Sequence, residues 1–207
     1  MSDKSLNWKF VEESVTEDQE LETARVNSLE VGLTPISPSV GSQIAFLAST
    51  ISAKSIVEIG TGCGLGTFWL LKGAPNASIT TVDDEAEYHA LTREVLEKLP
   101  NQKVRMILGR FSEVLPRLND AAYDLVLLHA RKSIATDFEY ALTLVRQGGV
   151  VLIANALNNT SVANPAKRDE MTKQLRSILE ETAESQSVIA SLIASGDGLL
   201  QIHVKSE

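Results

Sequence analysis

The chain has 207 residues, of which 43% are hydrophobic and 22% charged. This balance is typical of one globular domain with a sizeable core, not of a disordered chain. Nineteen Lys and Arg against twenty-seven Asp and Glu leave a net charge of -8, which repels a phosphate backbone, so we expect no nucleic-acid partner. A single cysteine, Cys63, excludes an internal disulfide framework. With no apolar signal segment at its start and no apolar run near the roughly 20 residues that cross a bilayer, the chain is predicted to be cytoplasmic, without a membrane partner.

The N-terminal part differs from the rest of the chain in composition. The first thirty residues are rich in acids and show no strand-like alternation, which predicts solvated helices. Residues 31–41 concentrate Pro and Gly, which break helices, so we expect a loop that leads into a helix over 39–52. We predict one domain over 1–207, with 1–38 as an N-terminal helical extension and loop.

From residue 55 onward, short β-branched runs alternate with longer runs of helical period. Such alternation, with strands apolar at nearly every position, predicts a parallel sheet covered by helices on both faces, a doubly wound α/β domain. The predicted strands are 55–59, 78–83, 104–108, 124–128 and 150–154. The predicted helices are 64–73, 85–99, 111–117 and 134–146.

The C-terminal part departs from this pattern. Asn164-Pro165 supplies an N-cap and a proline for a helix whose apolar stripe includes Met171 and Leu175. Two further strands, 187–193 and 199–204, flank the tight turn 195–198, which predicts a hairpin. An antiparallel strand at the end of a parallel sheet is not the plain dinucleotide-binding pattern.

The segment Val57-Glu-Ile-Gly-Thr-Gly-Cys-Gly-Leu-Gly66 is the most informative motif. Glycines at 60, 62 and 64 follow a strand and precede a helix, where a missing Cβ lets the backbone lie against a ligand. The nicotinamide fingerprint needs a glycine at the position of Leu65. Glu58 also departs from that fingerprint, because an ionised acid at a strand end needs a partner such as an ammonium group.

Asp83 ends the second predicted strand, twenty-three residues after Gly60. An acid at this place can accept hydrogen bonds from both hydroxyls of a ribose, in nicotinamide and adenosyl cofactors alike. In the alternative interpretation, the glycines only make a tight turn and Asp83 only caps the following helix.

Five motifs in order resemble S-adenosylmethionine-dependent O-methyltransferases of the catechol and caffeoyl-CoA type. Nearly the whole chain is similar to that family, and the resemblance implies a Rossmann-like seven-stranded sheet with an antiparallel last strand, the class I methyltransferase fold, and a homodimer. The segments that carry it are 57–71, 79–96, 104–116, 123–132 and 148–157.

The resemblance also implies cofactor contacts. Glu58 and the glycines Gly60, Gly62 and Gly64 would border the methionine part of S-adenosyl-L-methionine, and Asp83 would hold the ribose. Gly109, Arg110 and Phe111 would lie on the adenine side, where Arg110 replaces the usual acid. Phe111 would cover one adenine face or, alternatively, belong to the core. Gly66 stands where relatives often have a serine that contacts the cofactor carboxylate.

The metal site of the cation-dependent relatives is degenerate in this chain. The metal-binding Asp that ends their fourth strand is replaced by His129, whereas Lys132 keeps the place of their proposed general base. Their Asp-Asn pair after the fifth strand is Ala154-Asn155 here. Because Mg²⁺ draws its affinity from carboxylates, we expect no metal.

Lys132, His129 and Asn155 are the candidate catalytic residues. His129 can act as a general base without a metal; alternatively it caps a strand end or hydrogen-bonds a cofactor atom. Lys132 is the second candidate base or a solvated surface lysine. Asn155 orients the acceptor hydroxyl or has only a loop role.

The leading hypothesis is methylation of a hydroxyl on a small-molecule acceptor without a divalent metal. The first alternative, favoured by His129 and Ala154, is a non-catalytic protein that binds S-adenosylmethionine or S-adenosylhomocysteine. A nicotinamide oxidoreductase is disfavoured by Leu65 and Glu58. Catechols, other phenols, hydroxamates and amines remain open as acceptors, in a pocket expected from the 30s loop, the segment after Lys132 and residues 158–161.

Overall fold

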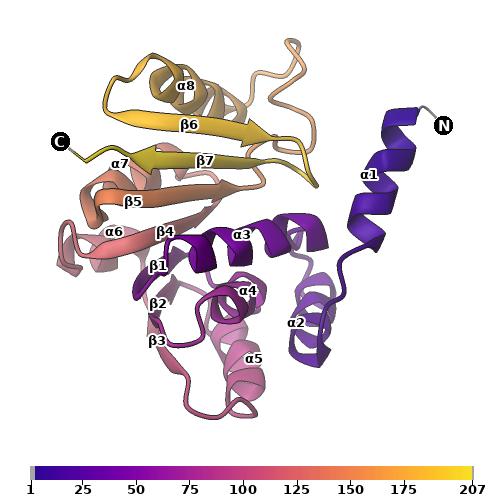
Figure 1. The fold of residues 1–207 in the computed structure, drawn as a ribbon, viewed down its shortest axis with the longest axis vertical. Coiled ribbons are helices and arrows are strands. Elements are labelled where there is room, and N and C mark those ends of the chain that lie inside the picture. Colours follow the sequence, from indigo (N-terminus) through magenta and orange to yellow (C-terminus); the bar gives the residue numbers. More distant parts are fainter. Residues whose placement is uncertain (1–2, 207) are drawn as a thin grey trace.

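The computed structural model describes residues 3–206, which form one sheet with helices on both faces (Figure 1). The seven strands lie in the order β3-β2-β1-β4-β5-β7-β6. The first five of that order run parallel, and β7 is antiparallel to both β5 and β6. This confirms the predicted seven-stranded α/β sheet with an antiparallel last strand. The strands are β1 (Ser55–Ile59), β2 (Ser78–Asp83), β3 (Lys103–Leu108), β4 (Tyr123–His129), β5 (Val145–Ala154), β6 (Val188–Ile193) and β7 (Leu199–Val204).

Two hydrophobic clusters cover the two faces of the sheet, and successive strand residues alternate between them, as the pleat requires. Ile56 belongs to the cluster under α2 to α5, whereas Val57 belongs to the cluster under α6, α7 and α8. The helices are α1 (Asp3–Glu13), α2 (Gln19–Glu30), α3 (Pro38–Thr50), α4 (Leu65–Gly73), α5 (Ala86–Leu96), α6 (Phe111–Val114) with a 3₁₀ turn at Leu115–Arg117, α7 (Ile134–Leu144) and α8 (Glu170–Glu184).

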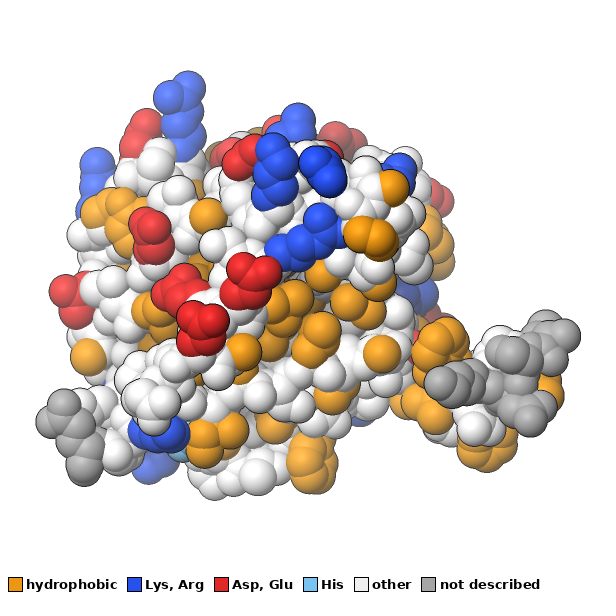
Figure 2. Space-filling model, turned by 90° about the horizontal axis from the view of Figure 1, so that it is seen from above, with side chains coloured by type: hydrophobic (Ala, Val, Ile, Leu, Met, Phe, Trp, Pro, Cys, Tyr) orange, Lys and Arg blue, Asp and Glu red, His pale blue; other side chains and the backbone are white. Residues whose placement is uncertain are grey.

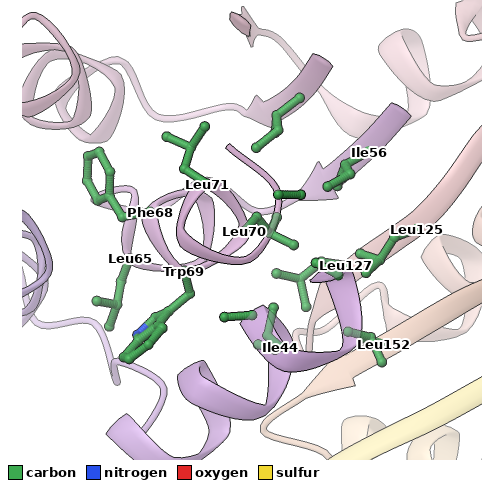
Figure 3. Packing of buried hydrophobic residues seen from close by; sticks show 14 of the residues in the cluster. Ile44, Ile56, Leu65, Phe68, Trp69, Leu70, Leu71, Leu125, Leu127 and Leu152 are labelled. Carbon is green, nitrogen blue, oxygen red and sulfur yellow. The ribbon is translucent and has the colours of Figure 1, made fainter. Parts of the chain in front are cut away.

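The helices α3 and α4 pack closely, with Trp69 and Ile44 among the side chains in their cluster (Figure 3). A Cβ on Gly41 would lie 2.1 Å from the Nε1 atom of Trp69. Only a glycine at this position lets the indole reach α3, and the contact anchors the helix that follows the glycine loop.

Of the N-terminal thirty residues, the described part from residue 3 onward is mostly helical, as predicted, but only partly solvated. Helix α2 buries Leu21 and Ala24 against the core, because it packs on α4 and α5. Helix α1 instead projects from the body (Figures 1 and 2) and exposes the large hydrophobic side chains Leu6, Trp8, Phe10 and Val11. Among residues 3–206, none of the helices has the length and apolar character that spanning a bilayer requires.

The helix predicted to begin at Asn164-Pro165 begins instead at Glu170, so that prediction is wrong. Its cap is Asp169, whose side chain accepts a hydrogen bond from the Thr172 N–H (3.0 Å). The preceding turn stays non-helical because Arg176 donates hydrogen bonds at 2.6 to 3.0 Å to the backbone carbonyls of residues 161, 162, 164 and 167. A side chain distant in sequence outweighs the local capping signal.

Candidate active site

A cavity of about 410 Å³ lies at the carboxyl ends of the parallel strands, the place where open α/β sheets bind ligands. Its wall is built from the glycine loop, the end of β2, the end of β4, the start of the loop after β5, and the segment that follows α2. The sheet topology therefore brings together segments that are far apart in the sequence, from Ser28 to Asp197.

The glycine loop takes backbone conformations that other residues adopt rarely. Gly60, Gly62 and Gly64 have φ angles of 99°, 50° and 86°, in the left-handed region. Gly60 and Gly62 line the cavity, whereas Gly64 does not. A Cβ on Gly64 would lie 2.7 Å from Thr92 Cγ2, so this glycine serves the packing of the loop on α5 and makes no cavity wall.

Asp83 binds backbone N–H groups on both sides of the cavity edge and also faces the cavity, whereas helix α5 has no side-chain cap. Its carboxylate is 6% exposed and accepts hydrogen bonds from the N–H groups of Gly62 (2.8 Å) and Glu85 (3.1 Å). It also lines the cavity. The neighbouring residues Asp84 and Tyr88 line the cavity as well; sequence reasoning missed them, although their place just after Asp83 was a signal.

Glu58 is fully buried and is not among the residues that line the cavity. Its Oε2 atom accepts hydrogen bonds from the hydroxyls of Thr67 and Thr81. Its Oε1 atom lies 3.1 Å from Nε2 of His129. The acid at the strand end therefore has partners within the chain, and the expected cofactor contact of Glu58 stays a prediction.

His129 lines the cavity at the end of β4, with 23% of its side chain exposed. Its ring passes beside the glycine loop: a Cβ on Gly66 would lie 2.1 Å from Glu58 Oε1 and 2.9 Å from His129 Nε2. A serine at position 66, expected from the resemblance, would collide with this pair. Gly66 and His129 are thus two departures from the family pattern that fit each other in space.

The other two candidate catalytic residues, Asn155 and Lys132, differ in their position relative to the cavity. Asn155 lines the cavity in a left-handed conformation with φ of 58°, whereas Lys132 is exposed and is not among the lining residues. Ala154 beside Asn155 is fully buried. Among the described residues, no group of three or more His, Cys, Asp or Glu side chains is placed to hold a metal ion.

The predicted adenine-side residues are not among the residues that line the cavity. Gly109 donates its N–H to the carbonyl of Asp83 (2.9 Å), and Arg110 is exposed and lies 3.8 Å from a Glu113 carboxylate oxygen. Phe111 is 7% exposed and belongs to the core, as its alternative interpretation proposed. Neither these three residues nor Lys132 line the cavity, and their contacts with a cofactor stay predictions.

Arg131 is a wall residue that sequence reasoning did not assign to the site. The centre of its guanidinium lies 3.2 Å from the centroid of the Phe111 ring, and Asp137 accepts hydrogen bonds from Nε (2.8 Å) and Nη2 (3.3 Å). The buried Asp137 carboxylate thus fixes a flat cationic group at the cavity edge. Its signal in the sequence was a basic residue two places after the end of β4.

Two of the three segments expected around an acceptor line the cavity, and their contact with an acceptor stays a prediction. Residues 32–36 and residues 158–159 line the cavity, but the segment after Lys132 does not. Cys63 lines it as well, and burial raises the pKa of its thiol despite a hydrogen bond with Ser28. The thiol is therefore held neutral, as an apolar part of the wall.

Comparison with known proteins agrees with this geometry. A family model described as O-methyltransferase matches residues 11–205. A Mycobacterium tuberculosis protein named as an O-methyltransferase is 33% identical over 197 residues, which cover 93% of this chain and 88% of that protein. A Mycobacterium marinum protein with the same kind of name is 33% identical over 193 residues, covering 91% and 86%. The chain belongs to the O-methyltransferase family.

Solved structures share the fold. A Corynebacterium glutamicum protein superposes with a TM-score of 0.89 at 23% identity, covering 100% of this chain and 99% of that one. The O-methyltransferase TomG from Streptomyces achromogenes, which is involved in tomaymycin synthesis and was crystallised with S-adenosylmethionine, gives 0.85 at 26% identity, with full coverage of both chains.

Proposed function

We propose that this protein transfers a methyl group from S-adenosyl-L-methionine to a hydroxyl of a small molecule, without a resident divalent metal. The observation that carries the proposal is the single cavity wall formed by the backbone of Gly60 and Gly62, the Asp83 carboxylate and the His129 imidazole. The family match and the S-adenosylmethionine complex of the similar TomG support the same cofactor and favour an enzyme over the non-catalytic alternative.

The cavity residues fit this cofactor. When bound, S-adenosyl-L-methionine supplies an electrophilic methyl group on a sulfonium. Gly60 and Gly62 leave the loop backbone bare on the cavity side, and Asp83 keeps acceptor capacity for ribose hydroxyls beyond its two backbone hydrogen bonds. Glu58 adds a buried negative charge behind the wall, which favours a cation in the cavity.

The residues of this chain at the metal-ligand positions of the cation-dependent relatives do not suit a metal ion. The corresponding positions hold an imidazole at His129, a methyl group at Ala154 and an amide at Asn155, and the imidazole Nε2 is already paired with Glu58. Mg²⁺ needs hard oxygen ligands and gains most of its affinity from carboxylates. Deprotonation of the acceptor then falls to a side chain at the cavity wall.

His129 is the base that the geometry favours over Lys132. It stands on the wall whereas Lys132 is exposed and outside it, and an imidazole can take a proton at neutral pH. Asn155, at the start of the loop after β5, presents an amide that can hold the acceptor hydroxyl.

Calorimetric titration with S-adenosylmethionine, S-adenosylhomocysteine and NAD tests the cofactor, and a panel of catechols, other phenols, hydroxamates and amines tests turnover. We expect binding of the two adenosyl compounds and methylation of a hydroxyl. Binding of NAD alone would overturn the proposal. Binding of S-adenosylmethionine or S-adenosylhomocysteine without methylation of any compound in the panel would support the non-catalytic alternative.

We further infer that residues 1–207 form one domain, with residues 1–38 as its N-terminal extension. We also infer that the protein is a homodimer in the cytoplasm. The single cysteine supports a reducing compartment, and the family resemblance supports the dimer. Helix α1 supports it too, since its exposed Leu6, Trp8, Phe10 and Val11 form an apolar projection that a second copy would cover. Light scattering at micromolar concentration should give the mass of two chains; the mass of one chain would refute the dimer.

A further inference from the structure

In the pair of Glu58 and His129, one nitrogen of the imidazole ring has a partner within the chain and the other has none among the described residues. Nε2 lies 3.1 Å from Glu58 Oε1. Nδ1 is not among the buried polar atoms that lack a partner in the described part of the chain, and no hydrogen bond of it is found there, so it is accessible in a residue that lines the cavity. The two nitrogens of one ring thus face a buried acid and the site of reaction.

The hydrogen bonds around Glu58 decide which nitrogen carries the proton. Both threonine hydroxyls, of Thr67 and Thr81, donate to Oε2, and Thr81 is itself paired with Thr61 (2.6 Å between the hydroxyl oxygens). A carboxylate that receives these donors is an acceptor at Oε1 as well. An acceptor at Oε1 calls for a donor at Nε2 of His129, which would leave the lone pair on Nδ1.

We propose that Glu58 is a positioning residue, which holds His129 as the Nε2–H tautomer so that Nδ1 takes the proton of the acceptor hydroxyl. This inference rests on the proposed methyl transfer. The Nδ1 lone pair would form the new N–H bond, and the electron pair of the broken O–H bond would stay on the acceptor oxygen. As that oxygen bonds to the methyl carbon, the carbon–sulfur bond would break with its electron pair going to sulfur, and S-adenosylhomocysteine would leave. The imidazolium keeps its Nε2–H on the Glu58 carboxylate, which stabilises the positive charge, and later releases the Nδ1 proton to solvent.

Gly66 is the position that makes room for this pair. A Cβ there would come within 2.1 Å of Glu58 Oε1 and 2.9 Å of His129 Nε2, closer than atoms in contact allow. The glycine, the histidine and the buried acid form one unit, in which the imidazole performs the task that a metal ion performs for the relatives with a carboxylate at position 129.

Glu58→Gln tests the tautomer directly. The glutamine oxygen can keep both threonine hydroxyls at the place of Oε2, which leaves its NH₂ to face His129 and donate to Nε2. The proton of the ring then moves to Nδ1. Long-range ¹H–¹⁵N spectra report tautomers without turnover, and the signal is assigned by its loss in His129→Gln, since the chain has only 3 histidines. We expect Nε2–H in the unmodified protein and Nδ1–H in Glu58→Gln.

Turnover supplies the second readout. Loss of a general base lowers kcat by about 10² to 10⁴, and the loss should grow along a series of phenols as the hydroxyl becomes less acidic. Gly66→Ala should show the same trend without changing any charge, because it forces the pair apart. Glu139→Gln, an exposed position on α7, is the matched control for the lost charge and should leave kcat unchanged. Thermal unfolding of each variant shows whether it is folded.

A Nδ1–H tautomer in the unmodified protein, or an unchanged Nε2–H tautomer in folded Glu58→Gln, would overturn the inference whether or not an acceptor is found. So would a loss of kcat that is equal for all phenols. A loss confined to S-adenosylhomocysteine affinity would instead make Glu58 a cofactor ligand and likewise overturn it. Absence of methylation in the unmodified protein would refute the proposed function, while the spectra would still decide the pairing.

Discussion

Replacing Asp83 by alanine should have two separable effects, because its carboxylate holds the glycine loop and also faces the cavity. In the ligand-free protein the change removes the acceptor of the Gly62 N–H (2.8 Å) and of the Glu85 N–H (3.1 Å). A hydrogen bond to a charged group contributes about 1.5 to 3 kcal/mol. The bond from the Gly62 N–H is the shorter of the two, and its acceptor, the Asp83 carboxylate, is buried. We therefore expect the free energy of unfolding to fall by about 1.5 to 3 kcal/mol.

The ligand should show a second loss. If Asp83 also accepts hydrogen bonds from the ribose, Asp83→Ala should weaken S-adenosylhomocysteine binding by about 1.5 to 3 kcal/mol, roughly 10- to 150-fold in Kd. Asp83→Asn is the matched variant, since its amide oxygen can keep the Gly62 bond while the charge is lost. It should recover most of the stability and little of the affinity.

Urea denaturation of the ligand-free variants and calorimetric titration at a temperature where both are folded separate the two effects. A stability loss in Asp83→Ala with an unchanged Kd would refute the ribose contact and leave only the two backbone hydrogen bonds of Asp83. An affinity loss without any stability loss would refute the argument from the Gly62 hydrogen bond.

Three further predictions concern the loop, the metal and acid stability. Gly62→Val should abolish S-adenosylhomocysteine binding in calorimetry, while circular dichroism should still show the fold. The φ of Gly62 is 50°, and the backbone must approach the ligand closely, so both requirements favour glycine. Unchanged binding would refute the role of the glycine loop in cofactor binding. Turnover should survive EDTA, and only the double change His129→Asp with Ala154→Asp should create Mg²⁺ binding in titration; activity restored by Mg²⁺ after EDTA would contradict this. Asp124→Asn should destabilise the protein more at pH 7 than at pH 3 in urea titrations, and an equal loss at both pH values would contradict the lowered pKa of Asp124.

The sign for Asp124 follows from its contacts. Partial burial raises the pKa of this carboxyl, but hydrogen bonds from the Lys54 N–H (2.7 Å), the Arg146 side chain (2.6 Å) and the Ser55 N–H (2.9 Å) outweigh it, so the net pKa is lowered. The unfolded chain therefore binds the proton first as the pH falls. The stabilisation is present above the ordinary aspartate pKa of about 3.9 and is lost as the pH drops through the folded value.

The sheet was predictable because its signals are local. Strands 55–59, 78–83 and 199–204 agree with β1, β2 and β7 at both ends, since continuous apolar runs bounded by turn residues have few other interpretations. The glycine loop and Asp83 were found for the same reason: their spacing along the chain fixes their place at the sheet edge.

The rest depended on contacts between distant residues. Glu58 and His129 are 71 residues apart in the sequence, so the partner of the buried acid could not be read from the motif that contains it. The start of α8 was misplaced because Arg176 binds carbonyls 9 to 15 residues before it. Local capping rules do not include such contacts, and the wall residue Arg131 has no motif of its own.

The place of β7 in the sheet has a consequence for synthesis of the chain. Although it is the last strand in sequence, β7 lies between β5 and β6 and pairs with both. Until residues 199–204 leave the ribosome, β5 keeps an open edge and β6 has no neighbour in the sheet. Open edges pair readily with other chains, so a nascent chain stalled at the hairpin turn, or one truncated there, would lose two strand pairings at once and become a substrate for chaperones and proteases.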